Sequence, residues 1–317
     1  MASQTEPYQP RIAVVGSGAI GCYYGGKLAA SGHDVHFLMR ADLETVRRRG
    51  LVIHSVEAPD VVLPHVHAYA STAEIGPADL VIVAVKTTSN KALETLIPPL
   101  LHAGTALVTL QNGLGNEAFL AERFGEERVM GALCFVCLNR TAPGVIEHFG
   151  HGTISIGEYK EKPKPRTQAF VEALCQAGID AVAVENLIAE RWRKLVWNVP
   201  FNGLSIAAGN VTTDRILADP GLAELARGLM REVIAIAAAR GHDIPVSFMD
   251  FQIERTREMG PYAPSSLLDY RAGLPVEVES IWGEPFREAC EAGLNTGRLE
   301  ALYYLLKGLT SNKETVL

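Results

Sequence analysis

The sequence RIAVVGSGAIG, residues 11–21, decides the fold of this chain. A short apolar run ends at glycines, and a helix of small residues is expected to follow over 19–30. In the pattern Gly-x-Gly-x-x-Gly, Gly16 permits a tight turn and Gly18 lets the backbone approach a pyrophosphate. Gly21 lets the helix pack on the strand, and the helix N-terminus offers its N–H groups to phosphates. The stretch therefore predicts a strand, a phosphate-binding turn and a helix.

The residues that follow continue to alternate between strands and helices, which is typical of a parallel sheet covered by helices. Buried strands are expected over 34–39, 79–85 and 105–110. A helix is expected over about 90–101. Shorter strands, with turns at Pro143-Gly144 and Gly150-His151-Gly152, are expected within 128–157. A helix over 166–177 and a strand over 180–185 would complete this part of the chain.

From about residue 186 the pattern becomes helical. We predict an α/β fold in which residues 1–185 form a Rossmann-type dinucleotide-binding domain and residues 186–317 form an all-α domain. The apolar helical half suggests a homodimer. Its helices are expected over residues 188–208, 214–240, 246–259, 265–272, 278–293 and 297–308.

Composition excludes several classes of protein. The chain has 317 residues, of which 48% are hydrophobic, so it can bury large cores and is not disordered. Its net charge is −7 and it has no basic block, which argues against nucleic acid or an anionic membrane as a partner. No stretch approaches the length of a membrane span, and the N-terminus MASQTEPYQP does not resemble a signal peptide. A soluble, cytoplasmic protein is expected.

Cysteine and histidine carry no chemistry in this interpretation. The five cysteines are an odd number and do not suggest a disulfide framework. Cys134 and Cys137 form a C-x-x-C within GALCFVCLN, which is typical of a buried strand and not of a redox helix. The pairs His65 and His67, and His148 and His151, have spacings that a metal could use. Because no third ligand clusters with either pair, no metal site is predicted.

The end of the second strand selects the cofactor. An acidic residue there would bind the ribose 2′-hydroxyl of NAD, but this chain has Arg40, whose guanidinium suits the 2′-phosphate of NADP. Asp42 is nearby and could weaken that preference. Lys86 and Asn112 follow two further strands, at the edge of the sheet where ligands bind, although Asn112-Gly113 is also an ordinary turn signal.

A polar stripe lies within RWRKLVWNVPFN, residues 191–202. Lys194, Asn198 and Asn202 are four residues apart and fall on one face of a helix that is otherwise largely apolar and therefore buried. Buried polar groups need partners, so the stripe is either a structural network or a pocket for an anionic or carbonyl-bearing molecule. Pro200 should kink or loosen this helix.

A second group of polar residues lies within PYAPSSLLDYRAGLPVEVESIWG, residues 261–283. Ser265 can cap a helix, and Gly273 with Pro275 can end it. Glu277 then begins a new helix. Without further context, this segment is helix punctuation with a solvated acid.

Together these motifs resemble the ketopantoate reductase family, also called 2-dehydropantoate 2-reductases, over nearly the full chain. The resemblance rests on GSGAIG with Arg40, Lys86, LQNG at 110–113, the stripe at 191–202 and the segment ending in GLPVEVESIWG. It implies a helical half like the C-terminal domain of 6-phosphogluconate dehydrogenase. Ser265-Ser266, Gly-Leu-Pro-Val-Glu and Glu279 stand where the family often has Ser-Met, Gly-Arg-Pro-Thr-Glu and Asp. These departures weaken the substrate assignment more than the reaction type.

The resemblance implies a role for each candidate residue. Lys194 would be the general acid, because a lysinium can stabilise and protonate the developing oxyanion. Glu277 would be a second catalytic residue that lies across the cleft, contacts the substrate or the cofactor and helps to place Lys194. The substrate would be held by Asn112, Asn198, Asn202 and Ser265. The cofactor NADPH or NADP⁺ would be bound by Gly16, Ser17, Gly18, Ala19, Ile20, Gly21, Arg40, Lys86 and Asn112.

The function implied is the NADPH-dependent reduction of 2-dehydropantoate to (R)-pantoate, on the route to pantothenate and coenzyme A. One alternative is a reductase of a different 2-oxo acid on the same scaffold. The other is an NADP-binding regulatory protein without turnover. A pair formed by Lys194 and Glu277 favours an enzyme, because a sensor needs no proton donor.

Overall fold

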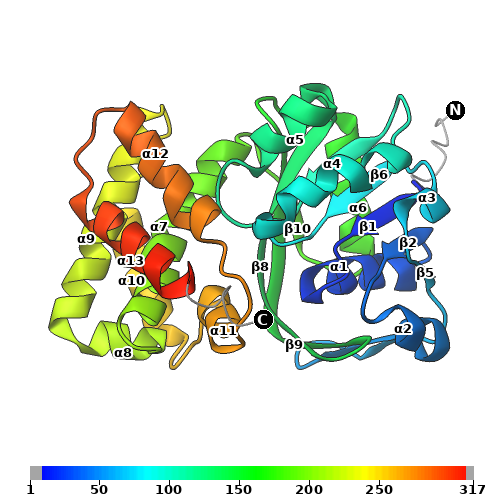
Figure 1. Cartoon of the computed structure of the whole chain (residues 1–317), viewed down its shortest axis with the longest axis horizontal. Coiled ribbons are helices and arrows are strands. Elements are labelled where there is room, and N and C mark those ends of the chain that lie inside the picture. Colours follow the sequence, from blue (N-terminus) through cyan, green and yellow to red (C-terminus); the bar gives the residue numbers. More distant parts are fainter. Residues whose placement is uncertain (1–8, 312–317) are drawn as a thin grey trace, which may run out of the picture. The chain divides into compact units, whose positions relative to one another are not determined.

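The computed structural model describes residues 9–311, which form two compact units (Figure 1). Unit 1 comprises the chain up to Gln111 together with Asn116–Leu187. Unit 2 comprises Asn112–Gly115 together with the chain from Ile188 onward. Within residues 9–311, no helix is both long and apolar enough to span a membrane. The predicted domain boundary after residue 185, and the roles assigned to the two domains, stay predictions.

The described part of unit 1 is built on a ten-stranded sheet with the order β4-β3-β9-β8-β7-β6-β1-β2-β5, and β10 pairs with β9. The strands β2, β1, β6 and β7 are parallel neighbours, as the alternation of elements predicts. The strands are β1 (Ile12–Val15), β2 (Val35–Leu38), β3 (Leu51–Ser55), β4 (Val61–Leu63), β5 (His67–Tyr69), β6 (Leu80–Val83), β7 (Ala106–Thr109), β8 (Val129–Ala142), β9 (Val145–Glu158) and β10 (Ala181–Ala183).

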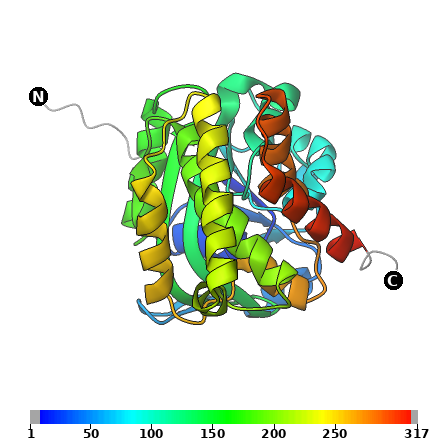
Figure 2. The same cartoon turned by 90° about the vertical axis from the view of Figure 1, so that its left-hand side faces the viewer.

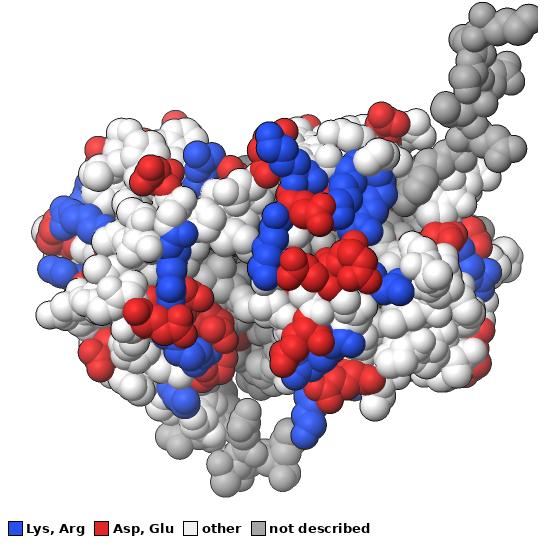
Figure 3. Space-filling view, turned by 90° about the horizontal axis from the view of Figure 1, so that it is seen from above, with Lys and Arg blue, Asp and Glu red and all other residues white. Residues whose placement is uncertain are grey.

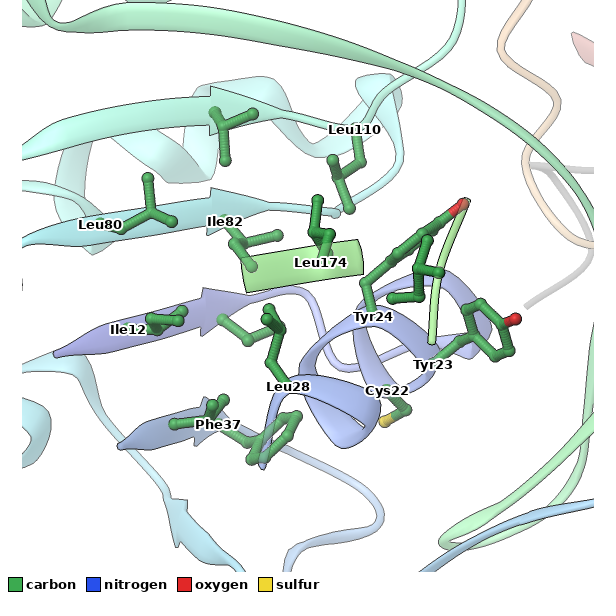
Figure 4. Close-up of a cluster of buried hydrophobic side chains, with 14 of the residues drawn as sticks. Ile12, Cys22, Tyr23, Tyr24, Leu28, Phe37, Leu80, Ile82, Leu110 and Leu174 are labelled. Carbon is green, nitrogen blue, oxygen red and sulfur yellow. The ribbon is translucent and has the colours of Figure 1, made fainter. Parts of the chain in front are cut away.

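Helices cover both faces of this sheet because its central strands are apolar on both sides. Ile12 and Val14 of β1 pack with α1 and α6, whereas Ala13 and Val15 pack with α3, α4 and α5. Figure 4 shows Ile12 in this first cluster with Leu28 of α1 and Leu174 of α6. The helical segments of unit 1 are α1 (Ala19–Ala30), α2 (Leu43–Arg49), α3 (Thr72–Ile75), η1 (Thr87–Ala92), α4 (Leu93–Leu96), η2 (Pro98–Leu100), α5 (Asn116–Phe124), η3 (Glu126–Arg128) and α6 (Pro165–Gln176).

Two local predictions in unit 1 are wrong. The helix expected over 90–101 is divided into η1, α4 and η2, and α4 ends where Pro98 and Pro99 lack the N–H groups that a continuous helix needs. The expected series of short strands within 128–157 is one long hairpin, β8 and β9, that turns at Pro143-Gly144. Gly150–Gly152 is not a turn but a bulge inside β9, where all three residues have positive φ and the register with β8 shifts.

The register of the parallel strands brings their carboxyl ends together. Val15 pairs with Leu38 on one side and with Val83 on the other, and Val83 pairs with Thr109. The segments that follow β1, β2, β6 and β7 therefore leave the sheet side by side, at the edge where open α/β sheets bind ligands.

The described part of unit 2 is helical, as predicted, around a core that includes Trp192, Phe201 and Trp282. Figure 2 looks onto these helices, with α13 in red. The helix expected over 214–240 is divided at Pro220, where Asp219 accepts a hydrogen bond from Leu222 N at 2.8 Å and starts a new helix. The elements are α7 (Leu187–Ala207), α8 (Thr213–Ala218), α9 (Pro220–Ala239), α10 (Ser247–Glu258), α11 (Ser265–Arg271), the π-helical turn η4 (Glu279–Gly283), α12 (Glu284–Glu291) and α13 (Gly297–Ser311).

The helix α7 runs without interruption through Pro200. Pro200 has no N–H to donate to the carbonyl of Val196 one turn earlier, and the helix continues without that bond. Trp282 Nε1 donates to Val199 O at 2.9 Å, and Gly203 leaves room for the indole. The proline therefore does not end the helix that carries the polar stripe.

The cysteines of the C-x-x-C lie on β8, so the prediction of a strand is confirmed. Cys134 and Cys137 form no disulfide and are only partly buried, because the outer half of the β8–β9 hairpin leaves the core. Burial raises the pKa of the Cys22 thiol on α1 to about 12, which keeps it protonated and unreactive.

Charge is mixed on the face of the molecule that Figure 3 shows. Acidic and basic side chains are interspersed on the face shown in Figure 3, and that view contains no basic patch. The ion pairs of the described residues include exposed ones, such as that of Arg123 with Glu94 and Glu122 and that of Lys160 with Glu126. Pairs of this kind contribute little to stability.

Candidate functional site

The three glycines after β1 differ in what they face. Gly16 has a φ of +109°, and a Cβ there would lie 2.4 Å from Val85 N, so the turn can pass the end of β6 only with glycine. A Cβ on Gly21 would lie 2.1 Å from Gly16 O. Gly18 is exposed, and a Cβ there would meet nothing within 4 Å. The fold itself requires Gly16 and Gly21, whereas Gly18 borders open space of the kind a pyrophosphate would fill.

The turn is fixed in place and ends in a helix N-terminus. Ser17 Oγ donates to Leu38 O at 2.7 Å, which ties the turn to the end of β2. Gly18 is the N-cap of α1 and supplies no side-chain cap, and Ala19 and Ile20 begin the first turn of the helix. That turn contains no acidic residue, so its N–H groups and the helix dipole are suited to a phosphate.

The acidic residue near the end of β2 is engaged elsewhere. The carboxylate of Asp42 is buried and accepts from Arg140 Nη1 at 2.9 Å and from Gly144 N at 3.4 Å. These bonds hold the β8–β9 hairpin against the start of α2. Arg40 is exposed. Between the two, the guanidinium and not the carboxylate is available to a ribose substituent, which supports the NADP interpretation.

The turn that carries Lys86 is held by side chains that the sequence analysis did not single out. Lys86 is exposed at the start of η1. Gln111 is buried, and its Nε2 donates to Val85 O at 2.9 Å and to Asn90 Oδ1 at 2.7 Å. Asn90 Nδ2 in turn donates to Asn116 Oδ1 at 3.1 Å. Asn90 therefore joins Gln111 and Asn116, the residues at which the chain leaves and re-enters unit 1.

In unit 2 the polar stripe of α7 is confirmed as a set of largely buried side chains. Asn198 and Asn202 are buried, and Lys194 is partly buried. Lys194 Nζ donates to Asn112 Oδ1 at 2.8 Å. The structure thus brings together two candidate residues that are 82 positions apart in the chain.

Asn202 has a structural duty that the sequence left open. Its Oδ1 accepts from Ser266 N at 3.0 Å and so caps α11. The expectation that Ser265 caps this helix is wrong, because Pro264 is the N-cap residue and Ser265 is an exposed residue of the first turn. The amide nitrogen of Asn202 is the part that remains suited to donate to a substrate oxygen.

Glu277 is buried, so the simpler interpretation of a solvated acid is wrong. Its carbonyl oxygen accepts from Ser280 Oγ at 3.3 Å and from Ile281 N at 3.3 Å, at the entrance to the π-helical turn η4. A buried carboxylate beside an irregular helix is typical of functional sites, where such turns are common.

Glu279, which departs from the family pattern, has a structural role. Its carboxylate accepts from Tyr303 Oη at 2.9 Å, from Arg287 Nη1 at 2.9 Å and from Lys307 Nζ at 3.3 Å. These contacts tie η4 to α12 and α13.

A glycine turn at the carboxyl edge of a parallel sheet, together with a helical unit in which a lysine contacts an asparagine, is typical of nucleotide-dependent oxidoreductases. Comparison with known proteins gives the family. The family model "Ketopantoate reductase PanE/ApbA" matches residues 12–161, and "Ketopantoate reductase PanE/ApbA C terminal" matches 186–310. The 2-dehydropantoate 2-reductase of Nostoc sp. is 40% identical over 310 residues, covering 96% of this chain and 97% of that protein. The chain belongs to the ketopantoate reductase family.

Solved structures agree with this assignment. The 2-dehydropantoate 2-reductase of Geobacter metallireducens has a TM-score of 0.91 and 43% identity, and the match covers 94% of this chain and 99% of that one. The enzyme of Methylococcus capsulatus has a TM-score of 0.90 and 34% identity, with 96% and 98% covered. The predicted family, the two-part fold and the class of oxidoreductases acting on CH–OH groups are confirmed, and membership supports a nicotinamide dinucleotide cofactor.

Gly16 and Gly18 should respond differently to substitution by alanine. Gly16→Ala should lower the free energy of unfolding by roughly 1–3 kcal/mol or more, because of its positive φ and its contact with β6. Gly18→Ala should leave stability almost unchanged, since its backbone is extended, but should weaken NADPH binding about tenfold or more. Denaturant unfolding and titration of NADPH fluorescence measure the two effects. Tight NADPH binding by Gly18→Ala would contradict the role given to this turn.

Proposed function

We propose that this protein reduces 2-dehydropantoate (ketopantoate) to (R)-pantoate with NADPH, using Lys194 as the general acid. Pantoate is a precursor of pantothenate and coenzyme A. Residues 1–185 would bind NADP, and residues 186–317 would bind the substrate and form a homodimer. The observation that carries the proposal is the hydrogen bond between Lys194 Nζ and Asn112 Oδ1, within a family of reductases. The dimer and the cytoplasmic location stay predictions.

The residues of unit 1 fit the cofactor. Gly16, Ser17, Gly18, Ala19, Ile20 and Gly21, with the N-terminus of α1, would hold the pyrophosphate. Arg40 would bind the 2′-phosphate, and Lys86 would bind a phosphate or ribose oxygen; Asn112 would border the nicotinamide. When bound, NADPH supplies the hydride.

The chemistry on the substrate side follows from the donors of unit 2. Negative charge builds on the carbonyl oxygen as C2 of the oxo-acid is reduced, and an ammonium stabilises that charge before giving up a proton. Asn112 accepts one N–H of Lys194, which limits how the ammonium turns and leaves two N–H groups for other acceptors. Asn198, Asn202 and Ser265 would donate to the carboxylate and hydroxyl oxygens of the substrate.

Glu277 would act on the lysine and not on the substrate carbon. Burial disfavours the ammonium form of a lysine, and a carboxylate close to it would oppose that effect; Glu277 is a buried carboxylate of the same unit. We therefore assign Glu277 the task of keeping Lys194 protonated at the start of each turnover.

A different 2-oxo acid is the second candidate substrate. The observation that favours it is the segment from Ser265-Ser266 to Gly-Leu-Pro-Val-Glu, which departs from the family pattern beside residues assigned to the substrate. The same residues of unit 1 and the same lysine would serve that reaction.

A panel of 2-oxo acids tests the proposed substrate. Purified protein should oxidise NADPH with ketopantoate at a higher kcat/KM than with pyruvate, 2-oxoisovalerate or benzoylformate. The measurement is the loss of absorbance of NADPH at saturating cofactor. A better substrate than ketopantoate would replace the specific assignment, and no turnover with any of the four would overturn the proposal of a 2-oxo acid reductase.

Lys194→Ala should lower kcat by roughly 10²–10⁴-fold, the usual contribution of a positioned acid. Arg193→Ala is a matched control, because Arg193 is the next residue of α7, is exposed and pairs only with Glu190 on the surface among the bonds described for it. The control should keep kcat within about twofold. Steady-state kinetics of the two variants decide the point, and a Lys194→Ala enzyme as active as the control would remove this lysine from the reaction.

Arg40→Ala should lower kcat/KM for NADPH by about 10- to 100-fold and leave NADH little changed, because only NADPH carries the 2′-phosphate. Arg48→Ala, an exposed arginine on α2, is the control. The preference for NADPH over NADH is measured for each variant. If Arg40→Ala retains the preference of the unmodified protein, another residue binds the phosphate.

A further inference from the structure

The segment Asn112–Gly115, which we name the Asn112 loop, belongs to unit 2 although it follows a strand of unit 1. Three contacts attach it there. Asn112 Oδ1 accepts from Lys194 Nζ at 2.8 Å, Leu114 N donates to Ser280 O at 2.9 Å, and the Leu114 side chain is buried in the core of unit 2. The loop is thus held on both sides of Gly113.

Gly113 lets the loop come unusually close to the turn η4. Its φ is +83°, and a Cβ there would lie 2.3 Å from Ser280 O and 2.5 Å from Ser280 C. These are backbone atoms of a helix and cannot move aside as a flexible side chain can. Any side chain at position 113 must therefore lift the loop away from Ser280.

The reason why Ser280 O accepts a bond from outside its helix lies five residues further on. In η4 the hydrogen bonds follow the π pattern, and Glu284 N donates to Glu279 O. The next rung of that ladder would run from residue 285 to Ser280 O. Residue 285 is proline, which has no N–H. Leu114 N takes the place of the missing donor.

Pro285 is not explained by a helix start. Proline is favoured in the first turn of a helix because the N–H groups there have no intrahelical acceptor. Here, however, η4 runs directly into α12, and Gly283 and Glu284 both have helical backbone angles. Pro285 therefore interrupts a continuous ladder, which costs stability unless another donor compensates.

We propose that Pro285 and Gly113 are positioning residues for the reaction. By reserving the carbonyl of Ser280 for Leu114, they seat the Asn112 loop so that Asn112 Oδ1 meets Lys194 Nζ. A lysine side chain has four rotatable bonds and can point in many directions. One fixed acceptor for its ammonium restricts the directions in which its remaining N–H groups point. This inference rests on the proposed role of Lys194 as general acid.

Pro285→Ala is the first test. The new N–H of residue 285 can close the π ladder onto Ser280 O and displace Leu114 N. We expect kcat to fall by about tenfold or more, since a misplacement of about 1 Å can cost up to roughly 100-fold, while KM for NADPH stays within about twofold. Stability should be unchanged or higher, because a proline leaves the interior of a helix.

Pro220→Ala is the matched control for this variant. Pro220 is the first residue of α9, where Asp219 caps the helix and no ladder is interrupted. Its kcat should stay near that of the unmodified protein. A purely structural role of Pro285 would instead lower the melting temperature of Pro285→Ala without a selective loss of kcat, and that result would overturn the proposal.

A pair of glycine variants provides a second, independent test. Gly113 and Gly115 have nearly equal φ angles of +83° and +85°, so alanine strains the backbone equally at both. A Cβ on Gly115 would meet only the side chain of Glu284, at 3.3 Å, which can move. Gly113→Ala should therefore lose about tenfold more kcat than Gly115→Ala. Equal losses would show that strain, and not the contact with Ser280, is responsible.

The chemical reactivity of Lys194 gives a measurement that needs no turnover. Limiting acetic anhydride acetylates neutral amines, and mass spectrometry compares Lys194 with the exposed Lys162 in the cofactor-free protein. Loss of the bond to Asn112 should raise the relative rate at Lys194 by roughly threefold or more in Pro285→Ala and Gly113→Ala, but not in the two controls. If wild-type protein reduces no 2-oxo acid, the proposed function fails, and this comparison still decides the positioning claim. Unchanged reactivity of Lys194 in both variants would overturn that claim.

Discussion

A lysine on a largely buried helix needs acceptors for its ammonium, and in this protein one of them is Asn112. The constraint shapes much of the molecule. Asn112 can reach α7 only because the chain leaves the sheet after Gln111, runs through unit 2 for four residues and returns at Asn116. Asn90 joins the two ends of this excursion, and Gly113 presses its middle against η4. A single hydrogen bond thus depends on residues from four parts of the sequence.

The cofactor side follows a different principle, in which the absence of side chains does the positioning. Beside Gly16 and Gly21, the space that a side chain would fill is taken by the protein's own backbone, so these two glycines serve the fold. Of the three glycines in the turn, it is Gly18 that borders open space. The same separation holds for charge. The carboxylate of Asp42 is hydrogen-bonded to the β8–β9 hairpin, whereas Arg40 is exposed. Folding thereby removes the acid that would compete for the ribose and supports a preference for NADPH.

The sequence predicts the parts of this structure that short-range rules govern. The strand, turn and helix around Gly16–Gly21 are confirmed, with α1 at Ala19–Ala30 as expected, because apolar runs and glycines act locally. The buried stripe of α7 also follows from spacing alone. Its partners do not: Asn112 is 82 residues from Lys194, and Ser266 is 64 residues from Asn202. Such pairings depend on how distant segments fold together, which is also why the cap of α11 was assigned to Ser265.

The roles of two further residues could not be predicted from the sequence, because no local sequence pattern marks them. Gln111 sits inside LQNG, yet only the structure shows that it binds the turn before Lys86. Pro285 looks like an ordinary helix start until η4 is seen to run into α12.

The central claim is that this fold transfers hydride from NADPH to C2 of a 2-oxo acid. Turnover of ketopantoate with NADPH deuterated at both C4 positions, followed by mass spectrometry and NMR of the product, tests it most directly. The account predicts pantoate with one deuterium at C2; pantoate without deuterium, or no pantoate, would contradict it.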